Sequence, residues 1–211
     1  MREFYSVSIC LFAVFSEPFD GIEGLALAPG LQKVHVYKPD KAHDPFLQDG
    51  PPPPLVLQLY FDSLSLLEAS CDGTLQPIKS ICEIQAMQVL PFIVPHPKTP
   101  SCTYLVAYEG KAEDEKAWHA HYLAHHPPLM ARLPGIRELE ICLPVDWRSA
   151  PGWRRAECMQ RNKVAFDSAE ALTAALNSPV RKEMRADFKA FPAYAGKITH
   201  YPMATQVLRT C

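Results

Sequence analysis

Short runs of apolar, β-branched and aromatic residues alternate along the chain with polar segments rich in proline, glycine and serine. Runs of this length predict β-strands at residues 5–15, 31–39, 55–61, 81–92, 103–109, 135–145, 158–166 and 198–208. Capping residues, acidic first turns and proline breaks predict helices at residues 63–70, 113–132, 169–176 and 180–188, with a short one within 19–28. Pro127 and Pro128 predict a kink or restart in the longest helix. The order is β-α-β-β-α-β, written twice.

One pattern of residues recurs at a fixed distance. Pro29-Gly30-Leu31 is followed by an apolar run, a polar loop, a second apolar run and Phe61-Asp62-Ser63. The same succession starts 105 residues later at Pro134-Gly135-Ile136 and ends at Phe166-Asp167-Ser168. Such a repeat predicts two similar modules, and the element order is that of the ferredoxin-like unit. We therefore expect an α+β fold of two tandem ferredoxin-like modules, packed on each other's bare sheet faces.

The proline-rich segment at residues 95–100 resembles a linker and places the boundary between the modules. Residues 1–95 then form a degenerate module with weak helices and a stiff run of four prolines at residues 51–54. Residues 101–211 form a second module with full helices. The difference between the copies favours the second module as the place of any chemistry.

Composition narrows the class of protein. The 211 residues are 48% hydrophobic and 21% charged, with a net charge of −2, which gives nucleic-acid binding no electrostatic support. Seven cysteines without a C-x-x-C pair indicate free thiols and a cytoplasmic location. The first apolar run has the length of a signal peptide, but Glu3 in its charged region favours a strand. No run reaches the ~20 apolar residues of a membrane-spanning helix.

Histidines are concentrated in the long predicted helix, at positions 119, 121, 125 and 126. His121 and His125 share a helix face, but the chain lacks H-E-x-x-H, so we predict no metal site. His126 precedes the proline pair near the helix end, and its ordinary pKa suits an acid or base. We predict His126 as the catalytic residue, with His125 as the second choice because one residue rotates the face by about 100°.

Other side chains are candidates for binding, each with a plainer alternative. Tyr122 has a hydroxyl that can orient a substrate carbonyl, and Trp118, four residues earlier, either lines the same cavity or packs on the sheet. Arg161 either holds a substrate carboxylate or forms a surface ion pair. Trp147 lies in a loop that also carries Trp153 and three arginines, and this loop is either a lid or a contact between modules.

A resemblance adds to these patterns. The stretch WHAHYLAHHPPLMARLPGIRELEICLP, residues 118–144, resembles the EthD-like family of the dimeric α+β barrel superfamily. It contains an aromatic pair, a His-x-Pro-Leu step at residues 126–129 and a glycine before an apolar strand. Residues 166–179 resemble the family's second helix, whereas the first module lacks the His-x-Pro step. The resemblance implies a barrel built from both modules within one chain, and activities that range from isomerases, cyclases and decarboxylases to monooxygenases.

No G-x-S-x-G, P-loop or G-x-G-x-x-G motif is present. We expect an enzyme of aromatic or lactone catabolism that uses no cofactor and performs isomerisation, cyclisation or decarboxylation (an isomerase or lyase). The alternatives are a ligand-binding or assembly protein without catalysis, and a cofactor-free or haem-dependent monooxygenase. The expected partner is a small-molecule substrate, not nucleic acid or membrane. The internal repeat permits a monomer, and a homodimer is also compatible.

Overall fold

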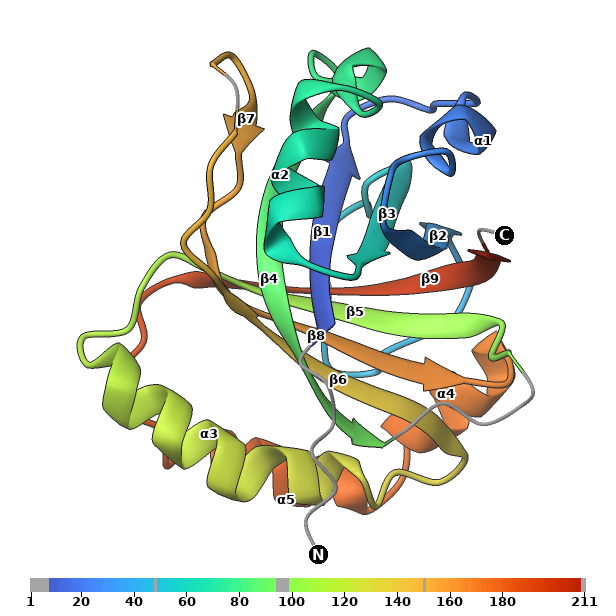
Figure 1. Cartoon of the computed structure of the whole chain (residues 1–211). Helices are drawn as coiled ribbons and strands as arrows, with labels where there is room; N and C mark the ends of the chain where they lie inside the picture. Colours follow the sequence, from blue (N-terminus) through green and yellow to red (C-terminus); the bar gives the residue numbers. More distant parts are fainter. Residues whose placement is uncertain (1–7, 48, 94–98, 150, 210–211) are drawn as a thin grey trace, which may run out of the picture.

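The computed structural model describes residues 8–47, 49–93, 99–149 and 151–209 (Figure 1). The strands are β1 (Ser8–Phe15), β2 (Leu31–Pro39), β3 (Leu55–Phe61), β4 (Cys82–Ile93), β5 (Cys102–Glu109), β6 (Ile136–Pro144), β7 (Arg154–Arg155), β8 (Cys158–Phe166) and β9 (Lys197–Arg209). The helices are α1 (Ile22–Leu25), α2 (Leu64–Asp72), α3 (Glu115–Met130), α4 (Ala169–Leu176) and α5 (Val180–Phe188), with a 3-10 turn at Gln76–Ile78.

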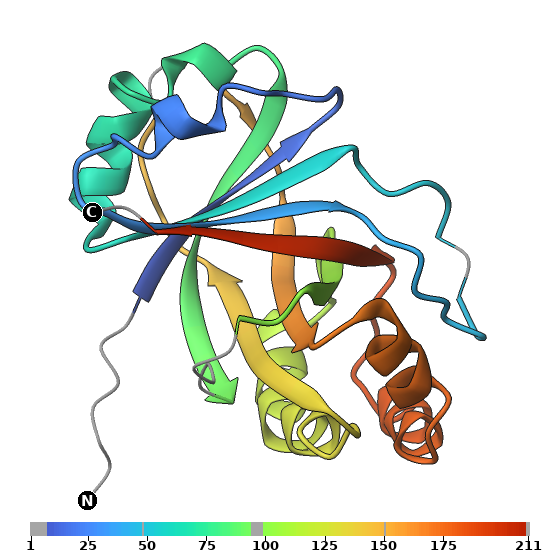
Figure 2. The same cartoon turned by 90° about the vertical axis from the view of Figure 1, so that its right-hand side faces the viewer.

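Eight of the strands close into one antiparallel barrel. Their order is β1-β3-β2-β9-β5-β8-β6-β4, and β4 pairs back to β1. The short strand β7 pairs in parallel with the start of β4. The helices α1 and α2 cover one side of the barrel, and α3, α4 and α5 cover the opposite side (Figures 1 and 2). The α+β class is therefore confirmed, with the sheet closed into a barrel.

Both halves of the chain have the same strand order. It is β4-β1-β3-β2 in the first half and β9-β5-β8-β6 in the second, and the halves join through β2–β9 and β4–β6. The repeated residues have equivalent local structure. Gly30 and Gly135 adopt φ angles of 72° and 74°, and Ser63 and Ser168 each cap a helix through the side-chain oxygen.

The two glycines provide a matched test of this equivalence. Alanine in place of Gly135 is expected to lower the free energy of unfolding by about 1 kcal/mol, because a left-handed backbone disfavours any Cβ. Alanine in place of Gly30 is expected to lower it by about 2–3 kcal/mol, since its Cβ would also collide with the Leu66 side chain. At position 135 a Cβ meets nothing within 4 Å. If urea denaturation showed that both variants lose the same free energy of unfolding, the expected difference between Gly30 and Gly135 would be contradicted.

The core has three layers, because the sheet is covered on both faces. Strand β3 illustrates this: Leu55, Leu57, Leu59 and Phe61 pack under the helices of the first half, while Val56 and Tyr60 point into the barrel. All seven β3 residues are therefore buried. Alternation of this kind explains why the strand reads as a continuous apolar run. A third cluster lies between the barrel and α3, α4 and α5.

Several details differ from the sequence predictions. Of the predicted kink or restart at Pro127 and Pro128, the restart is absent, since α3 is one helix through both prolines. Proline lacks the N–H donor but keeps its carbonyl, and Ala131 N donates to Pro127 O at 2.9 Å. The strand β7 and the turn Gln76–Ile78 were not predicted. Of the linker predicted at residues 95–100, residues 95–98 lie outside the described residues. Within the described part of the chain, no helix is long and apolar enough to cross a membrane.

Candidate functional site

A cleft of about 320 Å³ opens between the helices α3 and α5 and the outer face of β5 and β9. It continues inward as a smaller space of about 40 Å³ that reaches β8. Both parts are lined by Tyr108, His126, Arg181, Met184 and His200. The loop between β2 and β3 forms the remaining wall with Phe46, Leu47 and Asp49. The cleft therefore contains side chains from both halves of the chain.

His126 lies near the end of α3 and is 6% exposed. Its Nδ1 is 2.7 Å from Oδ2 of Asp187 on α5. Burial lowers the pKa of His126, and this outweighs the hydrogen bond to Asp187, which raises it. The imidazole is therefore neutral at neutral pH, with Nδ1–H donating to Asp187 and Nε2 unprotonated. Among the described residues no hydrogen bond to Nε2 is found, so this nitrogen is the one available to a bound molecule.

A second histidine in the cleft is held in a similar way. The Nδ1 of His200, on β9, is 2.8 Å from Oδ2 of Asp49, and the backbone N–H of His200 donates to the same oxygen at 2.8 Å. Burial is again the main cause of a lowered pKa at His200. The cleft thus holds two neutral imidazoles, each oriented by an aspartate from a different element.

Arg181, in the first turn of α5, is a buried cation that lines both parts of the cleft. Its Nη2 donates to Oδ2 of Asp44 at 3.0 Å, and the Tyr104 hydroxyl donates to the same oxygen. Nε of Arg181 is buried and has no hydrogen-bond partner. The backbone N–H of His43 also donates to Thr173 Oγ1 at 3.1 Å. These contacts fix the loop of the first half against the helices of the second.

Trp118 and Tyr122 form a layer behind His126. Their rings stack with centroids 5.0 Å apart, and neither is exposed. The Tyr122 hydroxyl accepts a hydrogen bond from Asn162 Nδ2 at 2.7 Å, and its ring lies 5.1 Å from that of His126. Burial raises the pKa of Tyr122 well above its ordinary value. Both aromatics therefore support the wall of the cleft rather than line it.

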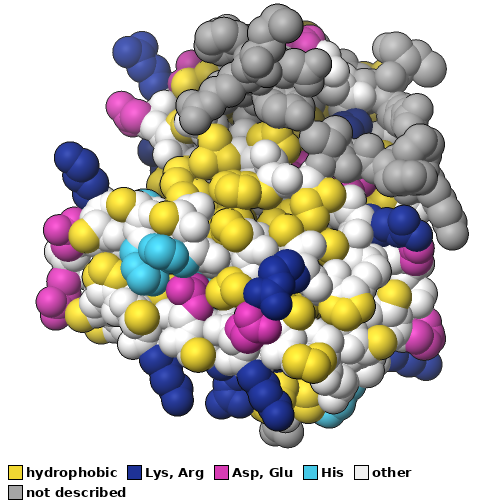
Figure 3. Space-filling model, turned by 90° about the horizontal axis from the view of Figure 1, so that it is seen from below, with side chains coloured by type: hydrophobic (Ala, Val, Ile, Leu, Met, Phe, Trp, Pro, Cys, Tyr) yellow, Lys and Arg dark blue, Asp and Glu magenta, His cyan; other side chains and the backbone are white. Residues whose placement is uncertain are grey.

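The other predicted site residues lie elsewhere. His125 is exposed on the outer side of α3, with its ring 4.5 Å from that of His121, and histidine side chains are visible on this face in Figure 3. Arg161 is on the opposite face of β8, inside the barrel. Trp147 packs with Trp153 in the apolar cluster of the first half, so its loop makes a contact between halves. The structure brings together His126, Tyr122 and Trp118, and separates them from the other three.

Sequence reasoning missed Asp187, Arg181, His200 and the two loop aspartates. Asp187 is 61 residues from His126, and Asp49 is 151 residues from His200. No local pattern connects positions so far apart. Across the described residues, no group of three histidine, cysteine or carboxylate side chains is arranged to hold a metal ion.

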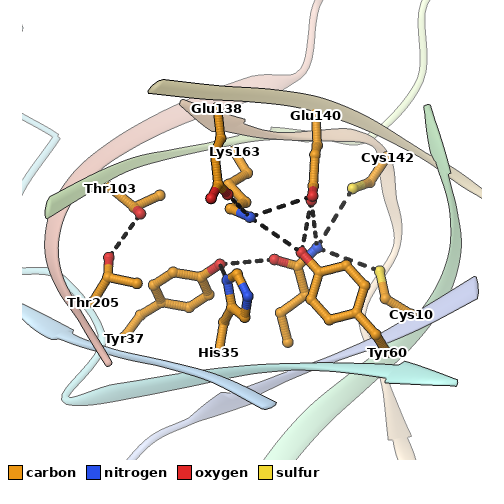
Figure 4. Close-up of polar contacts among 11 residues, drawn as sticks. Cys10, His35, Tyr37, Tyr60, Thr103, Glu138, Glu140, Cys142, Lys163 and Thr205 are labelled. Carbon is orange, nitrogen blue, oxygen red and sulfur yellow. Dashed lines mark hydrogen bonds and ion pairs between the residues drawn. The ribbon is translucent and has the colours of Figure 1, made fainter. Parts of the chain in front are cut away.

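The barrel interior contains a further polar cluster (Figure 4). Lys163 is fully buried and contacts Glu138 and, at 3.3 Å, Glu140. Tyr60 donates to Glu140 Oε2 at 2.7 Å, and Gln58 Nε2 donates to the same oxygen at 3.3 Å. Burial lowers the pKa of Lys163, but the two glutamates raise it on balance, so the lysine is charged. The cluster is a buried triad of one cation and two carboxylates at the centre of the fold.

Known proteins resemble this chain in fold and not in sequence. No family model matches it, and no curated protein matches it. Several solved structures do. An anthrone oxidase-like protein aligns with a TM-score of 0.64 over 98% of this chain and 94% of its own, at 13% identity.

Two proteins named "putative monooxygenase" also align over nearly their full length. The one from Fusobacterium nucleatum has a TM-score of 0.61, 9% identity, and coverage of 98% of this chain and 96% of its own. The one from Lactobacillus acidophilus has a TM-score of 0.57, 10% identity, and coverage of 97% of each chain. At these identities the likeness concerns the fold alone. The chain therefore shares its α+β barrel fold, over nearly its whole length, with these three proteins.

Proposed function

We propose that this protein is an enzyme that removes a proton from a small aromatic or otherwise planar carbonyl compound bound in the cleft. The observation that carries the proposal is the His126–Asp187 pair at the wall of the cleft, with Nε2 of a neutral imidazole left unoccupied. A neutral histidine oriented by a carboxylate is a competent general base. The apolar part of the wall, which includes Phe46, Met184 and Phe188, suits a planar ring.

The chemical step is a proton transfer from carbon to nitrogen. The C–H bond next to the carbonyl breaks, Nε2 of His126 takes the proton, and the electron pair moves onto the carbonyl oxygen as an enolate. Asp187 stabilises the imidazolium that forms, and the positive charge of Arg181 in the same cleft stabilises the enolate. Return of the proton at a different carbon completes an isomerisation. The same enolate is the starting point of cyclisation or decarboxylation.

A second candidate is oxidation of the enolate by O₂ without a cofactor. The observation that favours it is the shared fold with an anthrone oxidase-like protein and with two proteins named as monooxygenases. Oxidation of this kind begins with the same deprotonation, so it uses the same residues. In the case of anthrone, O₂ converts the deprotonated ring to anthraquinone and water. The two candidates differ only in the fate of the enolate.

The experiment uses anthrone as the probe, because its methylene protons are acidic and both fates can be followed. Under argon in D₂O, we expect the wild-type protein to accelerate deuterium incorporation at that methylene, measured by mass spectrometry. In air, oxygen uptake with formation of anthraquinone would select the oxidation candidate. His126→Ala should remove both activities, and His125→Ala should retain them because that side chain is exposed outside the cleft. Anthrone binding without exchange would select the non-catalytic alternative.

We further infer that the barrel consists of two ferredoxin-like halves, the second of which is EthD-like. The identical strand order and the equivalent glycine turns and serine caps support the division into two similar halves. The six cysteines among the described residues are free, which supports a reducing, cytoplasmic setting. Closure of the barrel within one chain supports a functional monomer.

A further inference from the structure

A second hollow of about 680 Å³ lies at one end of the barrel, on the inner side of the strands. It opens where β1 and β5 end and where β8 and β9 begin, and the prolines at residues 51–54 form part of its rim. The sheet separates it from the cleft, because inward and outward side chains alternate along each strand. It belongs to neither the His126–Asp187 pair nor the buried cluster around Lys163.

Arg161 is one of two arginines that line this hollow. The neighbouring Asn162 reaches outward to Tyr122 on α3, so Arg161 points into the barrel. Its guanidinium lies 5.3 Å from the centre of the Phe12 ring. Nε of Arg161 is buried and has no hydrogen-bond partner. No carboxylate of the described residues lies within ion-pair distance of Arg161.

The walls around this guanidinium are apolar. Phe12 and Val14 of β1 face Leu105 and Ala107 of β5 across the hollow. Carboxylates occur in the lining at the ends of their strands and in the loop before β8: Glu83, Glu109 and Glu157. The other arginine in the lining, Arg155, donates a hydrogen bond to the Trp147 carbonyl at 2.7 Å, and its guanidinium lies over the Trp147 ring. Arg161 is thus a cation with free donors in an apolar space, and the nearby glutamates disfavour a ligand with several negative charges.

We infer that the end of the barrel is a binding site for a small apolar monocarboxylate. The guanidinium of Arg161 takes the carboxylate, which also satisfies the orphaned Nε donor, and the apolar body lies against Phe12 and Leu105. Arginine is suited to this task because its planar donors match the two oxygens of a carboxylate. This site goes beyond the proposed enzymatic function and does not require it.

The first test compares 2-naphthoate with the uncharged 2-naphthamide by isothermal titration calorimetry on the full chain. We expect naphthoate to bind about 10- to 100-fold more tightly, as charge-assisted hydrogen bonds to arginine imply. Equal affinities, or no naphthoate binding up to about 1 mM, overturn the inference.

Variants then locate the site. Arg161→Met should make the two affinities equal, and Arg161→Lys should retain part of the preference for the acid. Val14→Trp fills the hollow and should abolish binding, whereas Met184→Trp fills the cleft and should leave the Arg161-dependent affinity unchanged. Thermal melting of each variant shows that it is folded. Loss of naphthoate binding in Met184→Trp, with binding retained in Arg161→Met, assigns the ligand to the cleft and overturns the inference.

Discussion

Replacing Lys163 with methionine is expected to lower the free energy of unfolding by about 3–5 kcal/mol at neutral pH, measured by urea denaturation. Lys163 is fully buried between Glu138 and Glu140 inside the barrel. Methionine keeps the apolar part of the side chain but leaves two buried carboxylates without their main cation. Lys33 is the other cation close enough to affect these groups, so the loss should fall at the lower end of the range.

The repeat supplies a matched control. Gln58 occupies the position in β3 that Lys163 occupies in β8, 105 residues later, and it is equally buried. Gln58→Met removes hydrogen bonds to Tyr37 and Glu140 but leaves the charges paired. It should therefore lower stability by only about 1–2 kcal/mol. If Gln58→Met lowered the free energy of unfolding as much as Lys163→Met does, the effect of Lys163→Met could not be assigned to the loss of charge.

One further variant separates the effect of charge from the effect of packing. The triple variant Lys163→Met, Glu138→Gln, Glu140→Gln has no buried charge in this cluster and should recover most of the lost stability. If the triple variant were as unstable as Lys163→Met, the loss of stability would be due to packing and not to charge.

The pH dependence of the loss follows from the directions of the pKa shifts. In the wild type, burial raises the pKa of Glu140, but Lys163 and Tyr60 lower it on balance. Its contribution to stability is therefore present above the ordinary glutamate pKa and is lost as the pH falls through the lowered one. Without Lys163, burial would raise the pKa, and protonation would relieve the penalty. Protonation in the variant narrows the stability gap between wild type and variant as the pH falls from about 7 to about 5. The loss of the wild-type contribution narrows it further only below the ordinary glutamate pKa.

Most of the secondary structure was predictable because it depends on local composition. Strands β2, β3 and β8 have the predicted bounds, since each is an apolar run that ends at a turn residue. Asp167 or Ser168 was expected to cap α4, and it is Ser168 whose side-chain oxygen accepts a hydrogen bond from Ala171 N. The two prolines in α3 led to a wrong prediction of a restart. A proline ends a helix only where the following turn cannot form its own backbone hydrogen bonds, and here Ala131 N donates to Pro127 O. Closure through β2–β9 depends on contacts between strands about 170 residues apart, which no local pattern contains.

The candidate site was predictable only in part, for a related reason. His126 was singled out by its place before the proline pair, and it lies in the cleft. Its partner Asp187 comes from a helix whose position relative to α3 depends on tertiary packing. The loop between β2 and β3 is 130 or more residues from its partners in the second half. In the structure its aspartates, Asp44 and Asp49, contact Arg181 and His200.

The second large effect is expected at the His126–Asp187 pair. His126→Ala should lower the rate of deuterium exchange into anthrone by about 10²–10⁴-fold, the usual contribution of a general base. Wild-type exchange should be constant above the lowered pKa of His126 and should fall as the pH drops through it, because protonation occupies Nε2. A pH-independent rate, or exchange in His126→Ala at the wild-type rate, would remove this residue from the mechanism.

Asp187→Asn tests whether the carboxylate orients the base. An amide N–H facing Nδ1 would favour the other tautomer, which places the ring proton on Nε2 and removes the lone pair from the cleft. We therefore expect exchange to slow by about 10²-fold or more, with the fold retained because the side chains are nearly isosteric. Glu183→Gln is the matched control, since Glu183 is also on α5 but pairs with Arg132 at the surface. Comparable slowing in both variants would mean that Asp187 acts through the stability of α5 and not through the tautomer of His126.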